Sequence, residues 1–281
     1  MIRAPSRSLR RIRLLVFLCI IVSITILASF MFASYIDEAE ASAMYLSLGF
    51  DHVFVISARP NIERRKLMSK LLRYQGIPHG FFPATMAYDI DHPEAYSYWL
   101  GETHWHSPTN YTLPAPVLAE FRTYMNVIND IIRLEYSSTL VLSDLVDITA
   151  DIKQQMQAII ARMPATWEIL YLGHCSISES SRPTTYHPRL FVATNPQCTF
   201  AYALSQAGAR RLKRVLDNMW PYPPKSFEQV LSDMVKPLFL EAYSVDPPLA
   251  APIKPVSETM FRPESSALSN STLDRLGMLV R

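Results

Sequence analysis

Two aspartates, Asp144 and Asp147, close a short apolar run near the middle of the chain. The run, LVLSDLVDIT, covers residues 140–149 and is typical of a strand that ends in polar residues. Carboxylates at a strand end provide the oxygen ligands that Mn²⁺ and Mg²⁺ prefer. Because the spacing is three residues, the two carboxylates meet at one ion only if the chain turns at 145–147. A turn or a helix cap is the other role open to both acids.

Other polar side chains follow other predicted strands. Arg59, Arg64 and Arg65 come after the first of them, where guanidinium groups suit phosphate, with a solvated helix face as the alternative. His174 follows a later apolar run, where it either contacts a ligand or acceptor or is a hydrogen-bonded structural histidine. These positions define a candidate site only if the fold brings the strand ends together.

An alternation of strands and helices is expected to position these residues. Apolar runs predict strands over 51–59, 79–86, 138–144, 167–173, 200–205 and 240–252. Helical periodicity is found over 61–76, 115–136, 151–164, 206–219 and 226–237. This order predicts an α/β fold, Rossmann-like with a mostly parallel sheet, in which ligands bind beyond the carboxyl ends of the strands. The loop at 87–116 is long enough to be functional or mobile.

The N-terminal segment has the pattern of a membrane anchor. Five of the first 13 residues are arginines, and the following 23 residues, 14–36, carry no charge. Such a run spans a bilayer core of roughly 30 Å. The arginines before it and the acids after it predict a cytoplasmic N-terminus and a lumenal body. A cleavable signal peptide, with ASA at 41–43 as its cleavage site, is the alternative.

Composition supports one full-sized domain behind this segment. The chain has 281 residues, 49% of them hydrophobic, and a net charge of +2 that gives no indication of nucleic-acid binding. Without the five N-terminal arginines the balance is 22 basic to 25 acidic residues, which is mildly acidic. The expected organisation is a basic tail, an anchor, a stem, a domain and an irregular C-terminal tail, over 1–13, 14–36, 37–49, 50–255 and 256–281.

Two further features suit an oxidising, glycosylating compartment. N-x-S/T triplets at Asn110 and Asn270 are candidate glycosylation sites. Cys19 falls in the apolar segment, which leaves Cys175 and Cys198 able to pair as a disulfide, with free cysteines as the alternative.

Five segments, taken in order, resemble glycosyltransferase family 25, which includes lipooligosaccharide and procollagen galactosyltransferases and many fungal membrane-anchored members. The segments are LGFDHVFVISARPNIERRKLM, RTYMNVINDIIRLEYSSTLVLSDLVDI, WEILYLGHC, CTFAYALSQAGARRL and SFEQVL with the later YSVDPPL. Together they cover roughly 48–252. WEILYLGHC and CTFAYALSQAGARRL match the family best, and both resemble its fungal members.

This resemblance implies a glycosyltransferase A-type fold, a UDP-sugar donor and Mn²⁺. It further implies transfer of a galactose-like hexose to a glycan or glycoprotein acceptor by a single-pass type II protein of the Golgi or endoplasmic reticulum membrane. By this resemblance Asp144 binds both the UDP-sugar donor and the metal, and Arg59 and Arg64 contact the nucleotide. Glu228 corresponds to a late acid of the family that acts as the base for the acceptor.

The chain departs from the family at the chemistry. The family's acidic motif reads Glu-Asp-Asp, whereas this chain has Ser143-Asp144-Leu145. A Ser-His pair on the preceding helix is here Thr123-Tyr124. A catalytically inactive relative that binds a sugar nucleotide or a partner enzyme is therefore the second expectation.

Overall fold

The computed structural model describes residues 47–91, 113–175, 182–220, 222–257, 260–263 and 268–280, together with residues 22 and 25–27. The chain divides into two units, Met1–Met44 and Tyr45–Arg281, and the fold below is that of the second. The expected membrane anchor at 14–36 and the sequon at Asn110 lie outside the described residues, apart from the isolated positions in the anchor. No helix within the described ranges is long and apolar enough to cross a membrane.

The centre of the fold is a seven-stranded sheet with the order β2-β1-β3-β7-β5-β8-β6 among the described residues. Its strands are β1 (His52–Ser57), β2 (Gly80–Pro83), β3 (Ser138–Ser143), β5 (Ile169–Gly173), β6 (Leu190–Val192), β7 (Ala201–Ser205) and β8 (Ala242–Val245). β1 pairs in parallel with β2 and β3, and β5 with β8, while β7 and β6 run antiparallel to their neighbours. The predicted Rossmann-like, mostly parallel α/β fold is confirmed.

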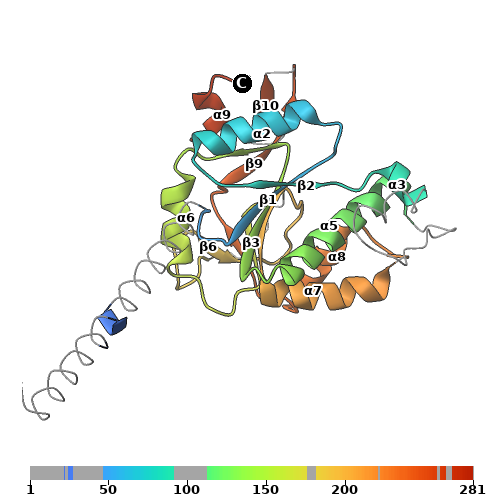
Figure 1. Ribbon diagram of the computed structural model, residues 1–281, viewed down its shortest axis with the longest axis horizontal. Helices are drawn as coiled ribbons and strands as arrows, with labels where there is room; N and C mark the ends of the chain where they lie inside the picture. Colours follow the sequence, from blue (N-terminus) through green and yellow to red (C-terminus); the bar gives the residue numbers. More distant parts are fainter. Residues whose placement is uncertain are drawn as a thin grey trace, which may run out of the picture. The chain divides into compact units, whose positions relative to one another are not determined.

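Helices cover both faces of this sheet (Figure 1). One face carries α2 (Ile62–Tyr74) and α6 (Ile152–Ile160), and the other carries α5 (Ala115–Arg133), α7 (Gln206–Met219) and α8 (Phe227–Val235). The short α3 (Ala87–Asp91) packs beside α5. Each helix turns an apolar stripe to the sheet; in α2 this stripe is Leu67, Met68, Leu71 and Leu72.

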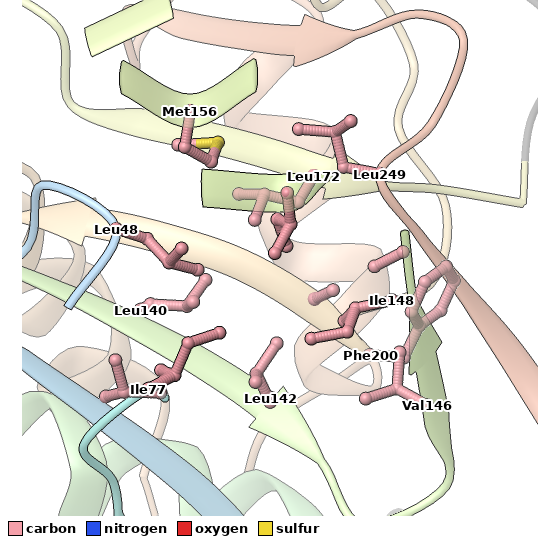
Figure 2. Packing of buried hydrophobic residues seen from close by; sticks show 14 of the residues in the cluster. Leu48, Ile77, Leu140, Leu142, Val146, Ile148, Met156, Leu172, Phe200 and Leu249 are labelled. Carbon is pink, nitrogen blue, oxygen red and sulfur yellow. The ribbon is translucent and has the colours of Figure 1, made fainter. Parts of the chain in front are cut away.

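The core on the α2 and α6 side is continuous from the first strand to a second small sheet. Figure 2 shows Leu140 and Leu142 of β3 packed among Met156, Leu172 and Ile148. The small sheet has the order β10-β9-β4, formed by β10 (Phe261–Pro263), β9 (Ala250–Pro255) and β4 (Val146–Ile148). It continues β3 directly, because the chain bends after Ser143 and pairs β4 with β9.

The C-terminal residues belong to this core. β10 pairs with β9, and the helix α9 (Thr272–Arg275) follows it with Thr272 and Leu273 buried. The sequence predicted an irregular tail from 256. The predicted strand at 240–252 is two strands, β8 and β9, separated by the turn at Asp246–Leu249.

Candidate functional site

A pocket of about 260 Å³ opens at the carboxyl ends of β1 and β3. The two strands are parallel neighbours, so Ser57, the last residue of β1, lies beside Asp144, the first residue after β3. The pocket wall is formed mainly by these strand ends, the start of α2 and the first turns of α5. Its lining comprises Ile56, Ser57, Ala58, Asn61, Ala84, Thr85, Pro116, Glu120, Thr123, Tyr124, Ser143 and Asp144.

The carboxylate of Asp144 is surrounded by hydrogen-bond donors. Ser57 Oγ donates to Asp144 Oδ2 at 2.7 Å, and Asn61 Nδ2 donates to the same oxygen at 3.3 Å. Arg64 Nη1 lies 3.7 Å from the other oxygen, Oδ1. Asn61 precedes α2 and turns its amide to Asp144 instead of capping the helix. The Asp144 side chain is 8% exposed and that of Arg64 is 39% exposed, so the guanidinium can also reach solvent or a ligand.

This donor set does not fit a divalent cation. A metal site needs lone pairs directed at the ion, whereas a hydroxyl and an amide donate to one oxygen of Asp144 and a guanidinium faces the other. The positive charge that a cation would supply is already provided by Arg64. No cluster of three or more His, Cys, Asp or Glu residues within the described ranges could hold a metal.

Asp147 has a different set of partners from Asp144. Its buried carboxylate accepts hydrogen bonds from Ser271 Oγ, from Leu273 N at 3.1 Å and from Ile148 N at 2.9 Å. Burial raises the pKa of Asp147, and these hydrogen bonds oppose the rise. The acid therefore fixes the first turn of α9 to β4. The expected convergence of Asp144 and Asp147 on one ion is not found, because β4 turns Asp147 toward the C-terminal residues.

Glu120 is a pocket residue that sequence reasoning missed. It lies on α5 one turn before Tyr124, and both line the pocket with Asp144. Although its side chain is exposed by area, loss of hydration raises the pKa of Glu120, and the charge of Glu228 raises it further. In the sequence Glu120 is one acid on a predicted helix. Its only link to the site is the i, i+4 spacing from Tyr124, which belongs to the Thr123-Tyr124 pair that replaces the family's Ser-His.

Glu228 begins α8 and is held by the backbone of Cys198. Its Oε1 accepts a hydrogen bond from Cys198 N at 2.6 Å. The neighbouring Phe227 stacks on Tyr124 with ring centroids 4.1 Å apart. Desolvation is the main cause that raises the pKa of Tyr124, and both Glu120 and Glu228 add to the rise. The charges of both acids therefore reach Tyr124.

The segment 197–200 joins the parts of this edge. A disulfide connects Cys198 with Cys175, whose Cα atoms are 5.6 Å apart. Thr199 Oγ1 is hydrogen-bonded to Tyr124 Oη at 2.8 Å, and Phe200 O accepts from Ser143 N at 2.8 Å. The φ of Cys198 is +69°, an uncommon left-handed conformation for a residue other than glycine. This backbone conformation accompanies the hydrogen bond from the Cys198 N–H to Glu228.

The remaining predicted residues lie away from the pocket lining. Arg59 is exposed, and its carbonyl accepts a hydrogen bond from Arg65. His174 is half-buried after β5 and does not contribute to the described lining. Asn270 is half-buried and accepts a hydrogen bond from Arg275 at 2.9 Å, so its glycosylation stays a prediction.

Comparison with known proteins gives a distant relationship. No protein-family model matches the chain. The chain is 26% identical over 220 residues to "Inactive glycosyltransferase 25 family member 3" of Homo sapiens, and 26% identical over 232 residues to "Probable inactive glycosyltransferase 25 family member 3" of Bos taurus. Each match covers 73% of this chain, and the chain spans 37% of the relative's length. These similarities support a distant relationship of the chain to glycosyltransferase family 25.

Proposed function

We propose that this protein is a glycosyltransferase-like protein that binds a UDP-sugar in the Asp144 pocket and does not transfer the sugar. The pocket lies beyond the carboxyl ends of β1 and β3, where nucleotides bind in Rossmann-like sheets. Arg64 is half-exposed beside it and supplies a guanidinium suited to a diphosphate, with Asn61 as a neutral donor. Arg59 remains a proposed second contact to the nucleotide.

The arrangement around Asp144 is the observation that supports the absence of transfer. Breaking the bond between sugar and diphosphate requires that the charge developing on the leaving diphosphate be stabilised. In this pocket Ser57 and Asn61 donate to one oxygen of Asp144 and Arg64 faces the other, so Mn²⁺ would have to compete with the guanidinium for this carboxylate. Arg64 can bind the diphosphate, but its charge is already partly balanced by Asp144 before a ligand binds. Both relatives are named as inactive or probably inactive.

An active hexosyltransferase is the second candidate, and the two glutamates favour it. Glu120 has a raised pKa in the pocket itself, and Glu228 is near enough to contribute to the rise. A carboxylate of raised pKa is a better proton acceptor for an acceptor hydroxyl. In this alternative Glu120 or Glu228 takes the proton while a galactose-like hexose passes from the UDP-sugar to a glycan or glycoprotein.

We further propose that this site faces the lumen of the Golgi or endoplasmic reticulum. The basic tip, the uncharged run at 14–36 and the sequons at Asn110 and Asn270 support this location. The disulfide between Cys175 and Cys198 suits an oxidising compartment.

Turnover measurements on the full chain separate the two candidates. UDP release is followed with UDP-galactose and UDP-glucose, with Mn²⁺ or with a chelator, and with lactose or a hydroxylysine peptide as the acceptor. The proposal predicts no release above a buffer blank in any condition. Release that disappears in Glu120→Gln or Glu228→Gln would instead establish the hexosyltransferase. Asp217→Asn, on the exposed side of α7, is the matched control.

A further inference from the structure

An apolar groove of about 650 Å³ lies between α7 and α8, on the sheet face carrying these helices. Its apolar lining is provided by Val215, Met219, Pro224, Val230, Met234 and Phe239. Its rim is charged, with Arg211, Lys225 and Asp233. An apolar hollow with a polar rim on a protein surface marks a site of interaction more often than a packing defect.

The groove is built by two helical stripes. Arg211, Val215 and Met219 follow one another at i, i+4 and i+8 on α7, and Val230 and Met234 are i, i+4 on α8. Because residues of both helices line one hollow, the surface between them is concave and not a flat patch. Methionine at two of the positions provides a flexible, polarizable wall that adapts to different side chains.

Phe239 lines the groove and is held in place although 65% of it is exposed. The chain turns at Leu238, which has a φ of +60° and is 69% exposed. Arg211 Nη1 then donates to Phe239 O at 2.6 Å, while Arg211 Nε pairs with Glu168 at 3.0 Å. The exposed aromatic ring therefore sits on a fixed backbone, as expected of a contact residue prepared before binding.

The charge around the groove is opposite to that of the rest of the body. The two helices and their ends carry six basic side chains, Arg210, Arg211, Lys213, Arg214, Lys225 and Lys236, against four acids, which are Glu228, Asp217 and Asp233 on the helices and Glu168 paired with Arg211. With these ten residues set aside, residues 14–281 retain 16 basic and 21 acidic residues. The groove thus lies in a locally positive surface on an acidic body, which attracts an acidic partner.

We propose that this groove binds an amphipathic helix of a partner protein, with apolar side chains in the channel and acidic side chains against α7. The channel shape fits a rod of side chains at i, i+3, i+4 and i+7 and not a flat lipid surface. The excess positive charge disfavours a symmetric dimer through this face, because two such faces repel each other. This binding is independent of the UDP-sugar pocket.

Three labelled peptides of 18 residues test the proposal by fluorescence anisotropy with the full chain. The first and second have Leu at i, i+3, i+4 and i+7, with Glu at the other positions of the first and Lys at those of the second. The third is a scrambled form of the first that lacks this spacing. The proposal predicts saturable binding of the first peptide, with the second and third at least about tenfold weaker. Added salt weakens the binding of the first peptide.

Variants distinguish the groove from other surfaces. Val215→Glu with Phe239→Glu introduces charge at surface positions and abolishes binding of the acidic peptide, whereas Val256→Glu, at an exposed valine after β9, leaves it unchanged. Melting curves of both variants show that the fold persists. Equal binding of the acidic and basic peptides, or no binding of either, overturns the proposal. Binding of this face to phosphatidylserine vesicles in place of the peptide also overturns the proposal. A dimer of the chain that dissociates in the double variant overturns it as well.

Discussion

The hydroxyl of Ser57 donates to a carboxylate oxygen of Asp144 at 2.7 Å, which ties the end of β1 to the end of β3. This bond places a donor on the acid that the sequence predicted to bind a metal. With Arg64 3.7 Å from the other oxygen, the acid at the centre of the edge helps to hold the strands together.

Asp144→Ala should lower the free energy of unfolding by about 2–4 kcal/mol, since it leaves Ser57 and Asn61 without their buried acceptor and Arg64 without its counter-charge. Urea denaturation of the full chain measures the loss. Asp217→Ala is the control, because its pair with Lys213 is exposed and contributes about 0–1 kcal/mol. Equal losses in the two variants would show that the donors around Asp144 do not stabilise the fold.

Asp147→Ala should destabilise the protein by about 2–4 kcal/mol, because three donors lose their acceptor at once. Hydrogen exchange should show the loss of protection concentrated at Leu273 and the other amides of α9. UDP-galactose affinity should not change. A variant of wild-type stability with weakened nucleotide binding would place Asp147 in the site and not at the helix.

The carboxyl group of Glu120 should titrate above the ordinary value of 4.5, and Glu228→Gln should lower its pKa toward that value. A folded-state pKa above the unfolded one means that the free energy of unfolding falls as pH rises from the unfolded to the folded pKa. Glu120→Gln should remove this decline. A ¹³C carboxyl titration measures the pKa directly, with Glu63→Gln on α2 as the control for the stability curve. An ordinary pKa for Glu120, or a raised pKa that does not change in Glu228→Gln, contradicts the electrostatic coupling of the two acids.

Gly173→Ala should be among the most destabilising single changes at this edge. A Cβ at position 173 would lie 2.2 Å from Ala250 O and 2.7 Å from the Phe200 ring, so β5, β9 and the 197–200 segment would all have to move. We expect a loss of more than about 3 kcal/mol in thermal unfolding. Gly277→Ala has open space but a φ of +66°, and should cost only about 1–2 kcal/mol. A milder effect at 173 than at 277 would refute the close packing.

The fold was largely predictable from the sequence because its strands are short apolar runs and its helices have one apolar face. The run at 138–144 is β3 within one residue, and the helix at 206–219 is α7 without any change. The antiparallel direction of β7 was not predictable, because pairing direction depends on connections and not on the pattern of one strand. The three-residue β4, β6 and β10 fall below the length at which alternation is informative.

The site was less predictable because its contacts join residues far apart in the chain. Asp144 could be named from its place at a strand end, but Ser57, 87 positions earlier, gives no sign that it would donate to that carboxylate. Asp147 accepts a hydrogen bond from Ser271, which is 124 positions away in the chain. This long-range contact gives Asp147 a structural role in place of the metal-binding role that its closeness to Asp144 suggested. Glu120 is one of several helix acids, and only the packing of α5 against α8 brings it near Glu228.

A calorimetric titration of the full chain with UDP-galactose, with Mn²⁺ and then with a chelator, tests the central claim most directly. We expect UDP-galactose to bind with the same affinity in both conditions. Arg64→Ala should weaken this binding at least about tenfold, whereas the control Arg73→Ala, at the far end of α2, should leave it unchanged. Absence of binding in both conditions would reject the nucleotide site. Binding that requires Mn²⁺ and is lost in Asp144→Asn would contradict the claim that Arg64 stands in place of the metal.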